Sequence, residues 1–140
     1  MAMTDTERAY LAAAVDGEGC ITFKTRTSLK QPWLFDVRVY ITNTNKAWLE
    51  QLQAIIGFGG ICRNGNPKPH SKQGWRYYID GKKGQDFLRQ IFDYLMIKQD
   101  QAYLAIYHTP NGSGKSLTEV GRQKRTELFL KMKALNKRGV

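Results

Sequence analysis

LAAAVDGEG, at residues 11–19, is the segment from which the rest of the sequence is interpreted. Small and apolar residues fill its first part, and a Gly-acid-Gly triplet ends it. Glycine adopts positive φ angles that other residues resist, so we expect Gly17 and Gly19 to turn the chain from a helix directly into a strand. The Glu18 carboxylate is thereby held at a fixed point at the C-terminus of that helix.

The helix that ends there is predicted to begin at Thr4. The Thr4 hydroxyl can accept a hydrogen bond from the backbone, and Glu7, three residues later, can complete a capping box. Small side chains recur at intervals of three and four residues and form a face with little bulk, made of Ala9, Ala12, Ala13 and Asp16. A face of this kind allows two helices to pack closely, within one subunit or between two.

Residues 11–23, LAAAVDGEGCITF, resemble the signature of the LAGLIDADG homing endonucleases. Five positions match this signature directly: Leu11, Ala12, Val15, Asp16 and Gly19. Glu18 takes the place of the second aspartate, and Ala13 stands where glycine is usual. One copy of the motif is visible, so the resemblance implies half of a nuclease, a homodimer whose interface contains Ala9, Ala12, Ala13 and Asp16.

Length and charge bound the possible functions. The 140 residues suit a single domain, residues 1–140, and the net charge of +10 indicates a polyanionic partner, because excess positive charge concentrates phosphates near the surface. No apolar run is long enough to span a bilayer and no signal-peptide core is present. We therefore expect an intracellular protein with no membrane partner, in a bacterium, a phage-infected cell or an organelle. Cys20 and Cys62 are too isolated to form a zinc motif.

Alternation of apolar and polar residues predicts two hairpins. Residues 20–26 and 35–42 form the first, and a strand from Ile61 with a return strand at 75–80 forms the second. A paired-strand ribbon can lie in the major groove of DNA and present alternate side chains to base edges. The outward-facing residues expected to bind DNA are Thr22, Lys24, Arg26, Ser28, Arg38, Tyr40, Arg76 and Tyr78. Lys72, in the loop of the second hairpin, is expected to meet phosphates. The alternative is a solvated sheet face whose charges serve solubility.

Helical spacing of apolar residues predicts further helices at residues 46–56, 84–97, 97–108 and 116–139. The last is basic and amphipathic, with an apolar face made of Leu117, Val120, Leu128, Phe129, Met132 and Leu135. The expected fold class is α+β, and the order of elements agrees with the αββαββα fold of the LAGLIDADG endonucleases. The resemblance implies an antiparallel sheet that forms a DNA-binding saddle, with the helices on the opposite face.

Hydrolysis of a phosphodiester needs cations that neutralise the charge building on the phosphate, and Mg²⁺ takes oxygen ligands. Glu18 is the obvious metal ligand, and a dimer supplies two such carboxylates. The resemblance implies that the Gly17 carbonyl shares the metal, that Mn²⁺ can replace Mg²⁺, and that Ca²⁺ binds without supporting cleavage. It also implies catalytic roles for Lys98, in the segment IKQDQA, and for Asn43, near the position of a solvent-orienting glutamine, with Lys46 a candidate second basic group. Without the resemblance, Lys98 reads as a surface lysine that caps a helix.

The sequence thus predicts a homodimeric, Mg²⁺-dependent, sequence-specific double-strand DNA endonuclease. The resemblance implies a staggered cut at a long, roughly palindromic site and a role in intron or intein mobility. Two alternatives stay open: a non-cleaving nucleic-acid binder of the same fold, such as an intron maturase or a DNA-binding regulator, and a basic structural protein such as a ribosomal component. The acid between two glycines favours the nuclease, because a pure binder gains nothing from carboxylates that face phosphates.

Overall fold

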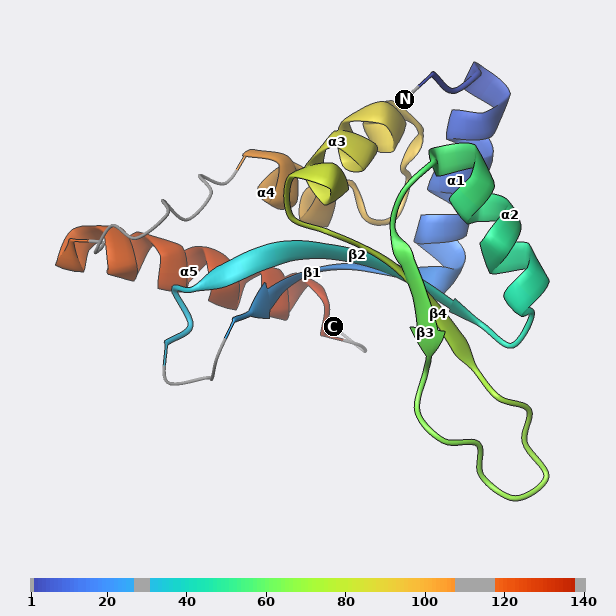
Figure 1. The fold of residues 1–140 in the computed structure, drawn as a ribbon. Helices are drawn as coiled ribbons and strands as arrows, with labels where there is room; N and C mark the ends of the chain where they lie inside the picture. Colours follow the sequence, from blue (N-terminus) through green and yellow to red (C-terminus); the bar gives the residue numbers. More distant parts are fainter. Residues whose placement is uncertain (1, 27–30, 108–117, 138–140) are drawn as a thin grey trace.

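The computed structural model describes residues 2–26, 31–107 and 118–137. Within these ranges the chain forms α1 (Asp5–Glu18), β1 (Gly19–Thr25), β2 (Phe35–Asn43), α2 (Lys46–Ile56), β3 (Gly60–Arg63), β4 (Trp75–Asp80), α3 (Gly81–Ile91), the 3-10 helix η1 (Phe92–Tyr94), α4 (Gln99–Tyr107) and α5 (Glu119–Leu135) (Figure 1). The predicted α+β class and the predicted order of helices and strands are confirmed.

The four strands form one antiparallel sheet in the order β1-β2-β4-β3. β1 pairs with β2 and β3 pairs with β4, as predicted for the two hairpins, and β2 pairs with β4 to join them. The helices pack on one face of the sheet, and α5 lies along the outer strand β1 (Figure 1). The predicted arrangement, with the helices opposite a polar sheet face, is therefore confirmed.

Alternate strand residues form the core, as the apolar periodicity predicts. The buried residues of β1, β2 and β4 are Ile21, Phe23, Phe35, Val37, Val39, Ile41, Tyr77 and Ile79. Phe23 and Phe35 stack with their ring centroids 4.3 Å apart. Because successive strand residues point to opposite faces, burial of this set fixes the direction of every side chain between its members.

Helix α1 begins as predicted but ends differently. Thr4 Oγ1 accepts a hydrogen bond from Glu7 N (3.1 Å), and Thr4 N donates to Glu7 Oε1 (2.9 Å), so the capping box is confirmed. The prediction that Gly17 and Gly19 use positive φ angles is wrong, because Gly17 lies inside α1 and Gly19 is extended, with φ −108° and ψ 178°. A Cβ atom on Gly19 would lie 2.9 Å from the Val15 Cα atom, so glycine is required by the close approach of two backbones.

The C-terminal helices follow the predicted pattern with shifted boundaries. The helix predicted at residues 84–97 begins at Gly81 and ends at Ile91, and α4 starts directly after Lys98, where a break was predicted. The packed face of α5 includes Phe129 and Met132, whereas Val120 lies off this face and is exposed. Leu117 lies outside the described residues. None of the helices in the described ranges is both long and apolar enough to cross a membrane.

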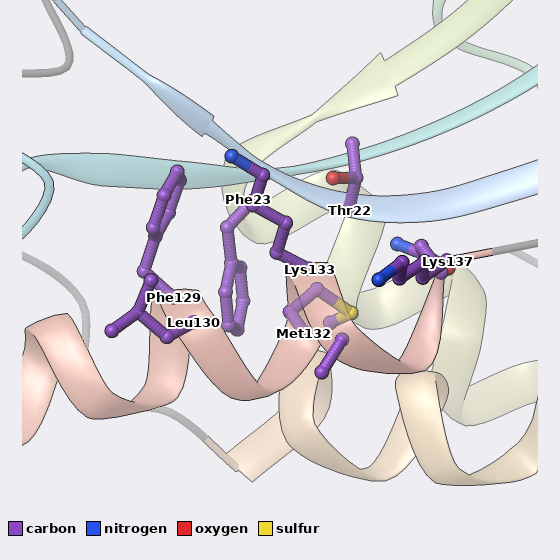
Figure 2. A pocket seen from close by; sticks show the side chains of 9 residues that line it. Thr22, Phe23, Phe129, Leu130, Met132, Lys133 and Lys137 are labelled. Carbon is purple, nitrogen blue, oxygen red and sulfur yellow. The ribbon is translucent and has the colours of Figure 1, made fainter. Parts of the chain in front are cut away.

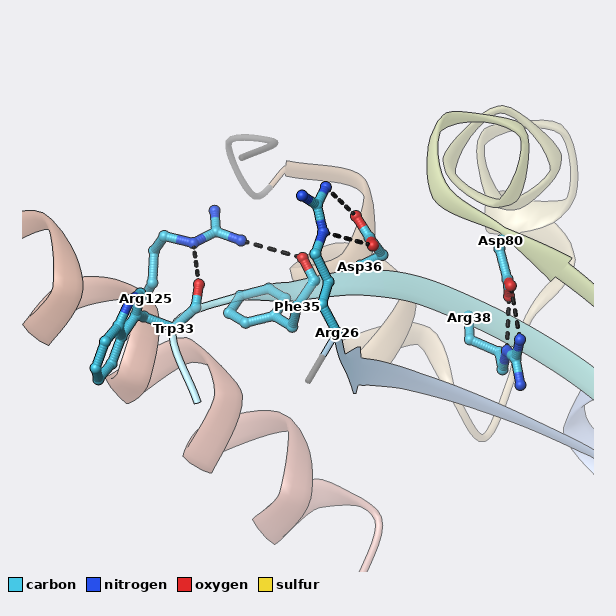
Figure 3. A network of polar contacts seen from close by, with 7 residues as sticks. All are labelled: Arg26, Trp33, Phe35, Asp36, Arg38, Asp80 and Arg125. Carbon is cyan, nitrogen blue, oxygen red and sulfur yellow. Dashed lines mark hydrogen bonds and ion pairs between the residues drawn. The ribbon is translucent and has the colours of Figure 1, made fainter. Parts of the chain in front are cut away.

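Arg125 joins α5 to the β1–β2 hairpin, and no sequence pattern pointed to it. Its Nε donates to the Trp33 carbonyl oxygen (2.7 Å) and its Nη2 to the Phe35 carbonyl oxygen (3.3 Å) (Figure 3). The guanidinium also lies 4.2 Å from the centroid of the Phe35 ring. The residue is only 6% exposed, and burial lowers the pKa of its guanidinium. An apolar replacement would leave buried carbonyl oxygens without these donors.

We expect Arg125→Met to lower the free energy of unfolding by about 2–4 kcal/mol, because two carbonyl oxygens lose charge-assisted hydrogen bonds. Arg122→Met is the matched control. Arg122 is an exposed arginine of the same helix whose guanidinium lies 5.3 Å from the Trp33 ring, and its loss should cost less than about 1 kcal/mol. Urea unfolding at one fixed protein concentration compares the two, and equal losses would contradict a special role for the buried arginine.

Candidate active site and nucleic-acid interface

Glu18 is the last residue of α1, and its side chain is exposed where α1 meets the sheet. Asn43, the last residue of β2, lies beside it, with Asn43 Nδ2 donating to Glu18 Oε2 over 3.4 Å. Asn43 Oδ1 accepts a hydrogen bond from Asn45 N (2.8 Å), which turns the amide NH₂ group toward the carboxylate. The antiparallel pairing of β1 and β2 thus brings together two residues predicted to be catalytic, although they are far apart in sequence.

Lys98 meets the same end of α1. Its Nζ donates to the Asp16 carbonyl oxygen (2.8 Å), next to the carbonyls of the last helical turn, which have no partner within the helix. The negative end of a helix dipole favours a cation, and α1 has no basic residue of its own in its last turn. Lys98 also precedes α4, and its carbonyl oxygen accepts a hydrogen bond from Ala102 N (3.0 Å), but its ammonium group is held by the helix that ends in Glu18.

The Asp16 carboxylate makes the junction between α1 and α4. It accepts hydrogen bonds from the backbone N–H groups of Met96 (2.7 Å), Ile97 (3.1 Å) and Lys98 (3.0 Å). Asp16 was predicted at a dimer interface, but these three bonds commit its carboxylate to contacts within one chain. Ala12, predicted on the same face, is fully buried in the core of the chain, so it cannot belong to an interface.

Glu18 and Lys98 line one pocket of about 550 Å³. The pocket also contains residues that the sequence did not single out: Thr42, Gln101, Asn136 and Lys137. Asn136 Nδ2 donates to the Ile21 carbonyl oxygen (2.8 Å), and Gln101 Nε2 donates to the Leu135 carbonyl oxygen (3.2 Å). These bonds fasten the C-terminal end of α5 against β1 and α4, and Lys137 thereby becomes a second cation at the pocket.

A second pocket, of about 770 Å³, lies between α5 and β1 (Figure 2). It is lined mainly by apolar side chains, among them Phe23, Phe129 and Met132, with Lys133 and Lys137 at its edge. Among the residues that the structure describes, no carboxylate or imidazole lines this pocket, so these residues offer no metal ligand or proton acceptor for hydrolysis. This apolar pocket adjoins the one that contains Glu18, because Thr22, Asn136 and Lys137 line both.

The residues predicted to bind DNA share the sheet face opposite the helices. Those that the structure describes there are Thr22, Lys24, Arg26, Arg38, Tyr40, Arg76 and Tyr78. Lys72 is exposed in the loop between β3 and β4, and Ser28 lies outside the described residues.

Arg76 and Tyr40 are in contact on this face. The Arg76 guanidinium lies 4.1 Å from the centroid of the Tyr40 ring. The hydrogen bond of Tyr40 to Cys20, together with burial, raises the pKa of the Tyr40 hydroxyl. Arg76 Nε is buried without a hydrogen-bond acceptor among the described residues.

Two carboxylates on this face were not predicted as site residues. Asp80 pairs with Arg38, with Nε–Oδ1 and Nη2–Oδ2 distances of 2.7 Å each (Figure 3). Asp36 pairs with Arg26 in the same side-on geometry, at 3.0 and 3.2 Å. The hydrogen bonds to these aspartates raise the pKa of both arginines. Part of the positive charge of the sheet face is therefore already neutralised by the chain itself.

The oxygen ligands at the end of α1 suit a hard divalent ion, but one chain supplies few of them. Among the described residues no group of three or more histidine, cysteine or acidic side chains could enclose a metal. Mg²⁺ commonly uses one or two carboxylates and completes its shell with water and phosphate oxygens. Glu18 and the Gly17 carbonyl fit that description. Lys46 does not line the Glu18 pocket, and its Nζ lies 4.4 Å from the Trp75 ring.

We expect Asp16→Ala to lower the free energy of unfolding by about 1–3 kcal/mol, because three backbone N–H groups lose their acceptor. The change also releases the start of α4, so Lys98 should become more mobile relative to Glu18. Glu50→Ala, which removes an exposed carboxylate from α2, is the control and should change stability by less than about 0.5 kcal/mol. Chemical denaturation measures both variants. If Asp16→Ala and Glu50→Ala lowered the free energy of unfolding by the same small amount, Asp16 would not stabilise the junction between α1 and α4.

No protein-family profile matches the chain, and no curated protein matches it significantly. Solved structures do match its fold. The homing endonuclease I-CvuI, in complex with the I-CreI target in the presence of Mg with DNA not cleaved, has a TM-score of 0.72 and 20% identity over 96% of this chain and 85% of that chain. The archaeal intron-encoded homing endonuclease I-Vdi141I, complexed with DNA, has a TM-score of 0.71 and 18% identity over 97% of this chain and 87% of that chain. The I-SmaMI LAGLIDADG homing endonuclease bound to cleaved DNA has a TM-score of 0.60 and 19% identity, and the match covers 99% of this chain and 46% of that one. The chain therefore has the fold of the LAGLIDADG homing endonucleases.

Proposed function

We propose that two copies of this chain form a Mg²⁺-dependent, sequence-specific, double-strand DNA endonuclease that makes a staggered cut at a long, roughly palindromic site. One observation carries the proposal. Glu18, Asn43 and Lys98 come from three distant parts of the sequence and meet at one end of α1, beside the outward residues Thr22 and Tyr40 of the sheet. An exposed carboxylate at this position adjoins the face that would carry the phosphates.

The residues of the chain divide the chemistry among them. The Glu18 carboxylate and the Gly17 carbonyl would hold Mg²⁺, which when bound neutralises charge on the phosphate and lowers the pKa of a coordinated water. Asn43 orients the Glu18 carboxylate through its amide group. Lys98, fixed to the Asp16 carbonyl, keeps an ammonium group in the pocket, where it stabilises charge that develops on phosphate oxygens. The structures with the same fold support a DNA endonuclease, because those described above are homing endonucleases in complex with DNA.

Glu18→Gln is expected to lower cleavage by on the order of a hundredfold or more, because the amide cannot replace the charge of the carboxylate at the metal. The substrate is a plasmid library that carries a randomised duplex segment, incubated with Mg²⁺, and cut ends are counted by sequencing. Glu50→Gln, an exposed carboxylate on α2, is the matched control and should cut as the wild type does. Cutting that persists in Glu18→Gln would remove the proposed catalyst, and site-selective binding without cutting by the wild type would favour a maturase or a regulator.

A dimer is part of the proposal because one Glu18 supplies too little charge for cleavage of two strands. The exposed side of α1 carries only small residues at Ala9, Ala13 and Gly17, so a second helix can approach its backbone closely. Met96 and Ile97, which are 90% and 70% exposed, adjoin this side because their backbone N–H groups are bound by Asp16. Exposed apolar side chains next to a flat helix face are typical of a protein interface.

Ala13→Leu is expected to weaken self-association by about tenfold or more, because added bulk at a close helix contact must be accommodated by shifting both helices. The fold of the single chain should be unaffected, since Ala13 is exposed within it. Ala134→Leu, at an exposed alanine of α5, is the control and should leave association unchanged. Sedimentation over a range of concentrations measures the dimer dissociation constant. A wild type that stays monomeric when bound to duplex DNA would contradict the dimer.

A further inference from the structure

Asp80 is, with Asp36, one of two carboxylates on a sheet face whose other charged residues are basic. It occupies the N-cap position of α3, where an aspartate ordinarily accepts a hydrogen bond from the first turn of the helix, but its side chain makes no such bond. Instead both of its oxygens accept from Arg38, at 2.7 Å each (Figure 3). The carboxylate is thus turned away from its own helix and toward the open face of the sheet.

The Arg38–Asp80 pair is held rigidly. Its arginine side chain is 17% exposed, whereas the aspartate side chain is 41% exposed, so the carboxylate forms the more accessible part of the pair. The guanidinium also lies 4.9 Å from the centroid of the Tyr78 ring, which restricts its remaining freedom. Partly exposed ion pairs contribute little to stability, so folding alone is a weak reason to keep an acid on this face.

The hydrogen-bond donors and acceptors that the pair leaves unused define what it can bind. Asp80 uses the Nε–H group and one N–H of Nη2. Three donors of Arg38 remain, namely both Nη1 hydrogens and the second Nη2 hydrogen, and each Asp80 oxygen keeps acceptor capacity. In the major groove a G·C base pair offers two acceptors on guanine, N7 and O6, and a donor on cytosine, N4. A phosphate offers acceptors and negative charge, which the Asp80 carboxylate repels. The pair therefore matches a base pair better than it matches the DNA backbone.

We propose that Asp80 is a specificity-determining residue, and that with Arg38 it forms a rigid donor–acceptor unit that recognises a G·C base pair and disfavours phosphate contacts. The inference rests on the proposed function in one respect, namely that duplex DNA lies across this sheet face.

The register of the sheet also fixes where the base pair lies. Arg38 lies opposite Thr22, four residues beyond Glu18, which is ~13 Å along a strand at ~3.3 Å per residue. That distance corresponds to about four base pairs of duplex from the phosphate near Glu18.

The test is selection of bound duplexes from a randomised library in the presence of EDTA, so that binding is measured without cleavage. The wild type is expected to select a G·C pair about four base pairs from the cut. Asp80→Asn should reduce the preference at that base pair by about fivefold or more and leave other positions unchanged. The same variant should bind random-sequence duplex more tightly, with a log–log salt slope steeper by ~0.9, the value for one added phosphate contact.

Asp86→Asn is the matched control. Asp86 pairs with Arg89 at 2.9 Å on α3, so this variant removes an equal charge from an ion pair that lies on a helix and not on the outward face of the sheet. It should leave the selected sequence and the salt slope as in the wild type. Arg38→Gln is a second variant that tests the same base pair, because it is expected to acquire a preference for a different base. Glutamine pairs with the N6 and N7 atoms of adenine, so the selected base pair should change from G·C to A·T.

An unchanged preference at this base pair in both Asp80→Asn and Arg38→Gln, with circular dichroism spectra like that of the wild type, would overturn the inference. So would a wild-type site without a G·C pair at this position. If the wild type selects the site but never cuts it with Mg²⁺, the proposed nuclease fails while the role of Asp80 stands. A wild type that binds duplexes with no sequence preference would overturn both.

Discussion

The hydrogen bonds of the Asp16 carboxylate are the constraint on which the candidate site depends. Three successive backbone N–H groups, at residues 96–98, donate to this one side chain. They join the end of α1 to the start of α4, and Glu18 and Lys98 each lie within two residues of that junction. The positions of the Glu18 carboxylate and the Lys98 ammonium are therefore related through a short carboxylate side chain bound to the backbone, and the Asp16 carbonyl also holds the Lys98 Nζ atom. In the signature motif, this aspartate thus acts as a structural residue, while Glu18 is left exposed.

Much of this architecture could be predicted from local pattern, and the exceptions have physical reasons. The faces of the strands follow from a period of two, because burial of Phe23 or Val39 leaves their neighbours no other direction. Helix faces are less certain. Ala12 was grouped with Ala9 and Ala13 because small residues recur there at helical spacing, but this spacing does not tell where the buried side of the helix begins, and Ala12 lies on the buried side. Lys137 carried no signal at all, since its place at the pocket depends on how α5 packs against β1.

The net positive charge of the chain and the paired arginines of the sheet face have different roles. The net charge attracts a polyanion, whereas the paired arginines can recognise it. The net charge of +10 is a property of the whole sequence, but Arg26 and Arg38 on the sheet face are paired with carboxylates of the same chain. Arg76 has no such ion pair among the described residues and stacks on an aromatic ring instead. A face arranged in this way has less long-range attraction than its composition suggests. It gains side chains whose donors and acceptors are oriented before a ligand arrives.

The packing of α5 against β1 limits edge-to-edge association of folded chains at high concentration. Outer strands of a sheet expose N–H and C=O groups that can pair with another molecule and start a growing fibril. Asn136 occupies the Ile21 carbonyl on the outer strand β1, and β3, at the other margin, has only four residues. Neither margin offers a long ladder to a second sheet. The chain can therefore display an open, polar sheet surface to a large ligand without inviting uncontrolled stacking of its own copies.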